Sequence, residues 1–197
     1  MWLPSTAGTG STDTTPPLQI DLVGELDAAF PLAVGARSPD GRFEVLADGF
    51  YVRLKDDEGP LRTTTQAAMV ESGVAVALDE ARHFSALVGV RYVDVSYDVS
   101  LGALAGSAGA DWVDPWIGAR AVFALDDTWS VRARGDVGGF GVGTEFSWQA
   151  MAFVGVAVSK SVAFDFGYRA IGIDYQGSGL DYEVVFHGPI IGLVVSF

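Results

Sequence analysis

The chain has 197 residues and a net charge of −13, from 25 acidic and 12 basic side chains, and 49% of its residues are hydrophobic. This length suits one domain with a full core, and the acidic balance argues against nucleic acid as a partner. No window approaches about 18 consecutive apolar residues, which excludes a transmembrane helix, and the lack of cysteine excludes disulfides and thiolate metal sites.

The first ten residues, MWLPSTAGTG, lack the basic and long apolar regions of a secretory signal. We therefore expect a mature exported chain with an added methionine, or else a chain that is not exported. The same ten residues could supply an N-terminal strand, with TDTTPP as the loop after it.

Alternating apolar and polar residues predict β-strands along the rest of the chain. Residues 18–30 form a first strand or, in a second reading, a helical turn at 21–26 followed by a strand at 27–36. Because bacterial single-chain barrels have an even number of strands, the N-terminal strand would complete ten; the alternative is eight strands with an N-terminal extension. The other predicted strands are 43–55, 67–78, 85–99, 112–125, 128–137, 146–158, 162–175 and 183–197.

Connections of two lengths alternate between these strands. The short ones are 79–84, 126–127 and 159–161, and the long ones are 56–66, 100–111, 138–145 and 176–182. Short turns at one end and longer loops at the other are typical of an outer-membrane β-barrel. We therefore expect one domain over residues 1–197, with the main barrel at 18–197.

The strand at 128–137 carries Arg132, Arg134 and Asp136 on one face and Trp129 and Val131 on the other. Alternation alone allows a soluble lipocalin-like barrel with its apolar face inward. Arginine among aspartate and glycine, however, fits a crowded interior in which guanidinium groups pair with carboxylates. A barrel of eight to ten strands is little wider than its own side chains, so we expect a plug rather than an open channel. The expected lumen charge network is Arg91, Asp114, Arg120, Arg132, Arg134, Asp136, Asp165 and Arg169.

Aromatic residues gather near the ends of the predicted strands, as they do at membrane–water interfaces. Such bands favour a membrane barrel over a soluble one. The expected membrane-interface aromatics are Trp112, Trp129, Trp148, Tyr168 and Tyr175.

The chain stops at Phe197, after Ile191, Leu193 and Val195 at alternate positions. This pattern looks like the signal by which the bacterial outer-membrane insertion machinery recognises its substrates. The motifs WVDPWIGAR (112–120), GDVGGFGVG (135–143), GYRAIGIDY (167–175) and HGPIIGLVVSF (187–197) resemble the small outer-membrane β-barrel proteins of Gram-negative bacteria, a group that includes OmpA-like and OmpW-like barrels. The resemblance implies a closed antiparallel transmembrane barrel in the outer membrane, and it implies no single activity.

Catalytic motifs are weak in this sequence. GGFGVG at 138–143 precedes a strand rather than a helix, so it is not a dinucleotide loop. The two histidines, His83 and His187, are predicted at opposite ends; His187 with Asp181 or Ser178 is the one arrangement that leaves a lipid-modifying enzyme open. We expect a non-enzymatic protein, structural or narrowly pore-forming, without cofactor or metal; a small-ligand carrier is a further alternative.

The expected partners follow from the membrane location. They are outer-membrane lipids, the insertion machinery, and other membrane proteins against the apolar walls. The acidic cluster at 56–58, with Asp94, Asp98, Asp111 and Asp181, predicts divalent-cation bridges to lipopolysaccharide phosphates.

Overall fold

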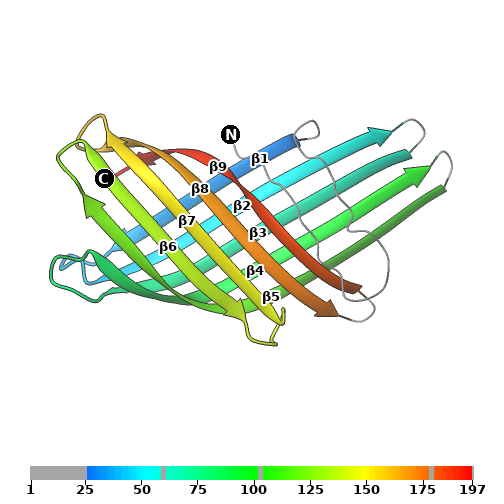
Figure 1. The fold of residues 1–197 in the computed structure, drawn as a ribbon, viewed down its shortest axis with the longest axis horizontal. Helices are drawn as coiled ribbons and strands as arrows, with labels where there is room; N and C mark the ends of the chain where they lie inside the picture. The colour runs from blue at the N-terminus through cyan, green and yellow to red at the C-terminus, as the bar shows by residue number, and fades with distance from the viewer. Residues whose placement is uncertain (1–25, 59–60, 102–103, 178–179, 197) are drawn as a thin grey trace.

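The computed structural model of the chain describes residues 26–58, 61–101, 104–177 and 180–196. In these residues nine antiparallel strands form an uninterrupted meander, and each strand pairs with the next one along the chain (Figure 1). The strands are β1 (Leu26–Arg37), β2 (Phe43–Glu58), β3 (Leu61–Ala77), β4 (Phe84–Leu101), β5 (Leu104–Ala124), β6 (Trp129–Gly139), β7 (Phe146–Ala157), β8 (Val162–Gly177) and β9 (Leu180–Val195).

The sheet curls strongly, so that β6–β9 cross in front of β1–β5 in Figure 1. An ion pair of 2.8 Å between Arg169 on β8 and Asp48 on β2 spans its inside. No hydrogen-bonded ladder joins β1 to β9 within the described ranges, so these nine strands form an open half-barrel. The expected all-β antiparallel architecture is confirmed; closure is not found in this part of the chain, and the strand expected at residues 1–10 lies outside it.

The first described strand, Leu26–Arg37, agrees with the second reading of this region, in which a strand runs over 27–36. The first reading placed a strand at 18–30; its residues before Leu26 lie outside the described part of the chain, and the strand continues past Phe30 to Arg37. Pro31 lies opposite Phe50 in the ladder with β2, and β1 has no partner on its other side among the described strands. Proline is tolerated at the edge of the described sheet.

The two ends of the sheet differ. At the turn end lie the connections 38–42, 78–83, 125–128 and 158–161. At the other end, here called the hairpin end, lie the last paired residues of β2 with β3, of β4 with β5 and of β8 with β9, together with the loop 140–145. The long connections expected at 56–66, 100–111 and 176–182 are wrong, because pairing continues to Glu58 with Leu61, to Leu101 with Leu104, and to Gly177 with Leu180. The outer face of β2–β5 becomes polar near the hairpin end, so the apolar alternation that marks a strand elsewhere fades there.

The inner, concave face has two layers. Near the hairpin end it is filled by an apolar cluster, the hairpin-end core. Below this core, toward the turn end, charged side chains surround a smaller apolar cluster of Leu46, Ala75, Leu87 and Trp116. Burial of aliphatic and aromatic side chains in this core stabilises the curl of the sheet by removing their surface from water. The hairpin-end core consists of Val52, Leu54, Ala67, Met69, Val93, Val95, Trp112, Ile171, Ile173, Val184 and Phe186.

Candidate functional site

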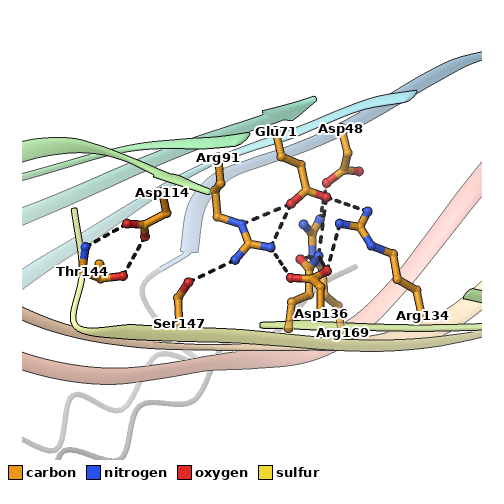
Figure 2. A network of polar contacts seen from close by, with 10 residues as sticks. Asp48, Glu71, Arg91, Asp114, Arg134, Asp136, Thr144, Ser147 and Arg169 are labelled. Carbon is orange, nitrogen blue, oxygen red and sulfur yellow. Dashed lines mark hydrogen bonds and ion pairs between the residues drawn. The ribbon is translucent and has the colours of Figure 1, made fainter. Parts of the chain in front are cut away.

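A buried ionic network occupies the middle of the inner face (Figure 2). Arg91 on β4 donates from Nε and Nη2 to Glu71 Oε2 on β3, at 3.1 and 3.0 Å, and from Nη2 to Asp136 Oδ1 on β6, at 2.5 Å. The side chains of Arg91, Glu71 and Asp136 have no exposed surface. A guanidinium fork that serves two carboxylates satisfies charges that would otherwise be costly to bury.

Arg134 closes this group from the opposite wall. Its Nη1 lies 2.7 Å from Glu71 Oε1 and its Nη2 lies 2.9 Å from Asp136 Oδ2. Its guanidinium also stacks over the fully buried ring of Trp116, 4.5 Å from the ring centroid. Cation–π contact of this kind is strongest where water is excluded.

Gln149 on β7 links the network to a second ion pair. Its Nε2 donates to Asp136 Oδ2 at 2.9 Å, and its Oε1 accepts from Arg169 Nε at 2.7 Å. Arg169 then pairs with Asp48 on β2 at 2.8 Å, beneath the hairpin-end core. Figure 2 shows these groups meeting from two facing walls of the sheet.

The local order of residues explains how these groups share one face. Successive strand side chains point to opposite faces, so residues two apart on one strand share a face. In the register, Glu71 lies opposite Arg91, Asp136 lies opposite Gln149, and Arg91 lies opposite Asp114. The glycine pair Gly73 and Gly89 lies beside them under Trp116, where a Cβ on Gly73 would be 2.6 Å from Val88 O and 2.7 Å from the indole.

Asp114 was expected in the charge network, and it is held by hydrogen bonds instead of an arginine. It accepts from the Thr144 amide at 2.8 Å, from Thr144 Oγ1 at 2.7 Å and from Trp112 Nε1 at 3.2 Å. Thr144 belongs to the loop 140–145, so Asp114 attaches that loop to the wall (Figure 2).

The remaining residues expected in the charge network lie nearer the turn end and form two separate groups, one around Arg120 and one made of Arg132 and Asp165. Arg120 donates from Nη1 and Nη2 to both oxygens of Glu44, at 2.9 and 2.8 Å, and Arg37 donates to Glu44 Oε2 at 2.8 Å. Arg132 pairs with Asp165 across the β6–β8 side. The predicted residues are therefore divided among a central network, a loop anchor and two rim clusters.

Sequence reasoning missed three of the five carboxylates that pair with these arginines, namely Asp48, Glu71 and Glu44. Glu71 stands among apolar residues in MVESGV, so nothing in its strand identifies it as a charged inner position. The signal that could have found it is parity, because Glu71 falls opposite Arg91 when the hairpin of β3 and β4 is paired around its turn at 78–83.

The arginines and carboxylates of the inner face balance in number. Six arginines (Arg37, Arg91, Arg120, Arg132, Arg134 and Arg169) meet five acids (Glu44, Asp48, Glu71, Asp136 and Asp165), and the sixth acid of these groups, Asp114, is held by Thr144 and Trp112. The net charge of −13 therefore comes from residues outside these inner-face groups.

The expected interface aromatics divide between the two faces. Trp112 and Tyr175 do not belong to an outer band. Trp112, only 8% exposed, is a member of the hairpin-end core, and Tyr175 packs against this core. The two rings are stacked, with 4.7 Å between their centroids. Trp112 is two residues from Asp114 on β5, so both side chains point to the inner face. A position near the end of a strand therefore did not tell which face an aromatic side chain occupies. Trp129, Trp148 and Tyr168 lie on the outer face, where Trp148 covers Gly172.

The outer face carries aromatic residues in two bands, of which Phe43, Phe84 and Tyr92 are exposed and Tyr51 is half-buried. On β2 and β4 the two bands are eight positions apart, at Phe43 and Tyr51 and at Phe84 and Tyr92. Between the bands the outer face is apolar and open, as at Val88 and Ile117, which are 55% and 53% exposed. Ile191, Leu193 and Val195 of the expected assembly signal also lie exposed on this face, whereas Phe197 is outside the described residues.

The two histidines are on different elements. His187 on β9 shares a hydrogen bond between its Nδ1 and the Tyr168 hydroxyl on the outer face. His83, in the turn 78–83, stacks on Phe123. The sequence alternative that paired His187 with Asp181 or Ser178 involves side chains outside the described set.

In the described part of the chain, no cluster of three or more His, Asp or Glu side chains is arranged to hold a metal ion. The same residues contain no helix with the length and hydropathy to cross a membrane. Comparison of the sequence with models of known protein families finds no match, and no curated protein matches the chain.

Proposed function

We propose that this chain is an outer-membrane β-barrel protein with a filled interior, acting as a structural element of the membrane and not as an enzyme. The observation that carries the proposal is the opposite character of the two strand faces: exposed and apolar outside, buried and charge-paired inside. In water an apolar face of this extent would drive aggregation, whereas acyl chains solvate it without cost.

The height of the apolar band fits a bilayer. Eight residues from Phe84 to Tyr92 span about 26 Å along the strand at about 3.3 Å per residue. With the strand tilt of about 35–45° found in membrane barrels, the vertical height is about 20 Å, near the apolar band of outer-membrane proteins.

Beyond the aromatic band nearer the hairpin end, that of Tyr51 and Tyr92, the outer face becomes polar and the inner face apolar. This reversal supports strands that leave the bilayer at that band. Past Tyr92 the outer face of β4 carries Asp94, Ser96 and Asp98, while the inner face turns to Val93 and Val95 of the hairpin-end core. The protruding hairpins would thus be a water-exposed structure with their own apolar core.

Closure of the barrel is part of the proposal. In a nine-strand meander β1 and β9 run in the same direction. One strand from the chain before Leu26, as expected at residues 1–10, would be antiparallel to both and would give the even number typical of bacterial barrels. Such closure also removes two edges whose backbone groups cannot stay unpaired in lipid.

A filled lumen argues against an open pore. The network around Arg91 fills the middle of the inner face, and the hairpin-end core lies above it. We therefore favour a structural role over a narrow pore. The resemblance to OmpA-like and OmpW-like barrels agrees with this proposal.

The test is membrane fractionation in a Gram-negative host combined with a heat-modifiable gel shift. We expect the protein in the outer-membrane fraction, with a band that migrates differently before and after boiling. Recovery in the soluble fraction with no shift would reject the membrane proposal, and a large unblocked conductance in a planar bilayer would reject the filled lumen alone.

Divalent cations are the proposed link to lipopolysaccharide. Asp94 on β4 and Asp111 on β5 are register partners on the outer face, just above Tyr92. Like charges directly opposite each other repel, and a bound cation would relieve that repulsion. Chelation should therefore lower the thermal stability of the wild-type protein in native membranes. It should not lower that of the double variant Asp94→Asn/Asp111→Asn. Equal stability of the wild type with and without chelator would oppose this link.

A further inference from the structure

A small cavity of about 60 Å³ opens on the inner face at the turn end. Its lining combines inner-face strand positions with residues of the turns 38–42 and 78–83. Glu44, Ser85 and Arg120 share the inner face, since Glu44 lies opposite Ala75, and Ser85 lies opposite both Ala77 and Arg120. The charged and hydroxyl side chains of the lining are Arg37, Arg42, Arg82, Arg120, Glu44 and Ser85, here called the basic mouth.

The basic mouth has an excess of positive charge. Four arginines face one glutamate, a net charge of +3 in a chain whose total is −13. Glu44 occupies Nη1 and Nη2 of Arg120 together with Nε and Nη2 of Arg37. One carboxylate therefore cannot satisfy the donors that converge here.

One of these donors, on Arg120, has no protein acceptor in the described part of the chain. Arg120 Nε is buried and makes no hydrogen bond within the described ranges. Arg42 and Arg82 make no ion pair of 4.0 Å or less among the described residues, although the charge of Arg42 adds to the hydrogen bonds from Ser38 and the Arg42 amide that lower the pKa of Asp40. The nearby carboxylates are engaged by the turns themselves, because Asp40 accepts from Ser38 Oγ and the Arg42 amide, and Asp79 accepts from the amides of His83 and Phe84.

The turn 78–83 brings Arg82 to the lining of the cavity. Arg82 has a φ of 60° and its guanidinium lies against Gly41, where a Cβ would be 3.0 Å from Cζ and Nη1. The two turns are joined through β3, because the Ala77 amide donates to Arg42 O at 2.9 Å and the Leu78 amide donates to Phe84 O at 2.8 Å. Arg42 and Arg82 thus line the cavity from two turns that are connected through β3.

We propose that the basic mouth binds a small tetrahedral oxyanion, a phosphate group, between Arg42, Arg82 and the free Nε of Arg120. Planar guanidinium forks match the geometry of phosphate oxygens, and the bonds are charge-assisted on both sides. The cavity volume admits one such group and excludes a nucleotide. The phosphate could be inorganic or part of a lipid headgroup.

The test measures binding of inorganic phosphate, and separately of short-chain phosphatidylglycerol below its micelle concentration, to the full chain refolded in a zwitterionic detergent. Calorimetry of the wild type should show saturable binding of at least one of the two at constant ionic strength in chloride. The double variant Arg42→Gln/Arg82→Gln should weaken that binding by about tenfold or more, since each lost charge-assisted bond is worth a factor of that order.

Lys160→Gln is the matched control, because Lys160 is exposed in the turn 158–161 at the same end and outside the basic mouth. Binding that is lost in the arginine variant and kept in Lys160→Gln supports the site. Preference for the inorganic ion identifies a free phosphate, and preference for the lipid identifies a headgroup. No saturable binding of either, or equal weakening in both variants, overturns the proposal. The measurement is made in detergent, so its outcome is independent of the membrane location.

Discussion

Arg91 on β4 and Asp136 on β6 form an ion pair across the inside of the curled sheet, with 2.5 Å between Nη2 and Oδ1, although β5 separates their strands. A flat sheet could not bring these two atoms together. The contact therefore belongs to the curvature of the whole structure, and it supplies Arg91 with a second carboxylate beyond its register partner in β3, Glu71.

Arg91→Met tests how far the fold depends on this network. The change leaves Glu71 and Asp136 buried with one cation fewer, so we expect the free energy of unfolding to fall by about 3–5 kcal/mol. Urea unfolding in detergent micelles measures it. Lys160→Met, an exposed charge lost from the turn end, should change stability by less than about 0.5 kcal/mol; equal stability of the two variants would contradict the role of the network.

Thr144→Val tests the attachment of the loop 140–145 to Asp114. The variant keeps the shape of the side chain and removes the hydroxyl that donates to Oδ2 at 2.7 Å. A lost hydrogen bond to a buried carboxylate should cost about 1.5–3 kcal/mol. Thr144→Ser, which retains the hydroxyl, is the control and should cost less; a larger loss in the serine variant would show that the methyl group matters more than the bond.

Gly73→Ala tests the close packing of Trp116 on the inner face. A Cβ at Gly73 would be 2.6 Å from a backbone oxygen, Val88 O, which cannot move without distorting the ladder. We expect a loss of about 1–3 kcal/mol on unfolding in detergent. Gly106→Ala is the matched change in open space, since nothing lies within 4 Å of the added atom, and it should be neutral or slightly stabilising. An equal change in unfolding free energy for the two alanine variants would contradict close packing at Gly73.

Asp79 makes the turn 78–83 sensitive to acid. Hydrogen bonds from the backbone amides of Phe84 and His83 lower the pKa of its carboxyl below the ordinary value of 3.8. A lowered folded-state pKa means that the stabilisation is complete above 3.8 and is lost as the pH falls through the folded-state pKa. Asp79→Ala should therefore be less stable than the wild type at pH 7.

The difference in unfolding free energy between wild type and Asp79→Ala should shrink as the buffer is taken below pH 3.8. Glu80→Ala, at the next and exposed position of the same turn, provides the comparison. A difference for Asp79→Ala that stays constant across this pH range would show that the capping bonds do not depend on the charge.

The strands from residue 43 onward were predictable because their two faces differ in polarity with a period of two. Arg132, Arg134 and Asp136 were placed on one face for that reason, and they do share the inner face. Partners were not predictable in the same way. Asp48 meets Arg169 only because β2 and β8 approach across the interior, and no local pattern encodes that approach.

The hairpin end was the least predictable part. There the inner face becomes apolar and the outer face polar, so Trp112 and Tyr175 pack inward although their position near the strand ends suggested an interface. The same reversal made the extensions of β2–β5 read as loops. A rule that took one face as apolar along the entire strand could not find a strand whose environment changes midway.

Accessibility of nitroxide labels along the outer face of β4 tests the central claim, that this face meets lipid between two aromatic bands and water above them. Labels at Val88, Val90 and Asp98 share the face of one strand, which removes differences of fold between the sites. In bilayers we expect the labels at Val88 and Val90 to be relaxed by dissolved oxygen and not by a water-soluble nickel chelate, and the label at Asp98 to show the reverse. Labels at Val88 and Val90 that respond to the nickel chelate as strongly as the label at Asp98 would contradict the account.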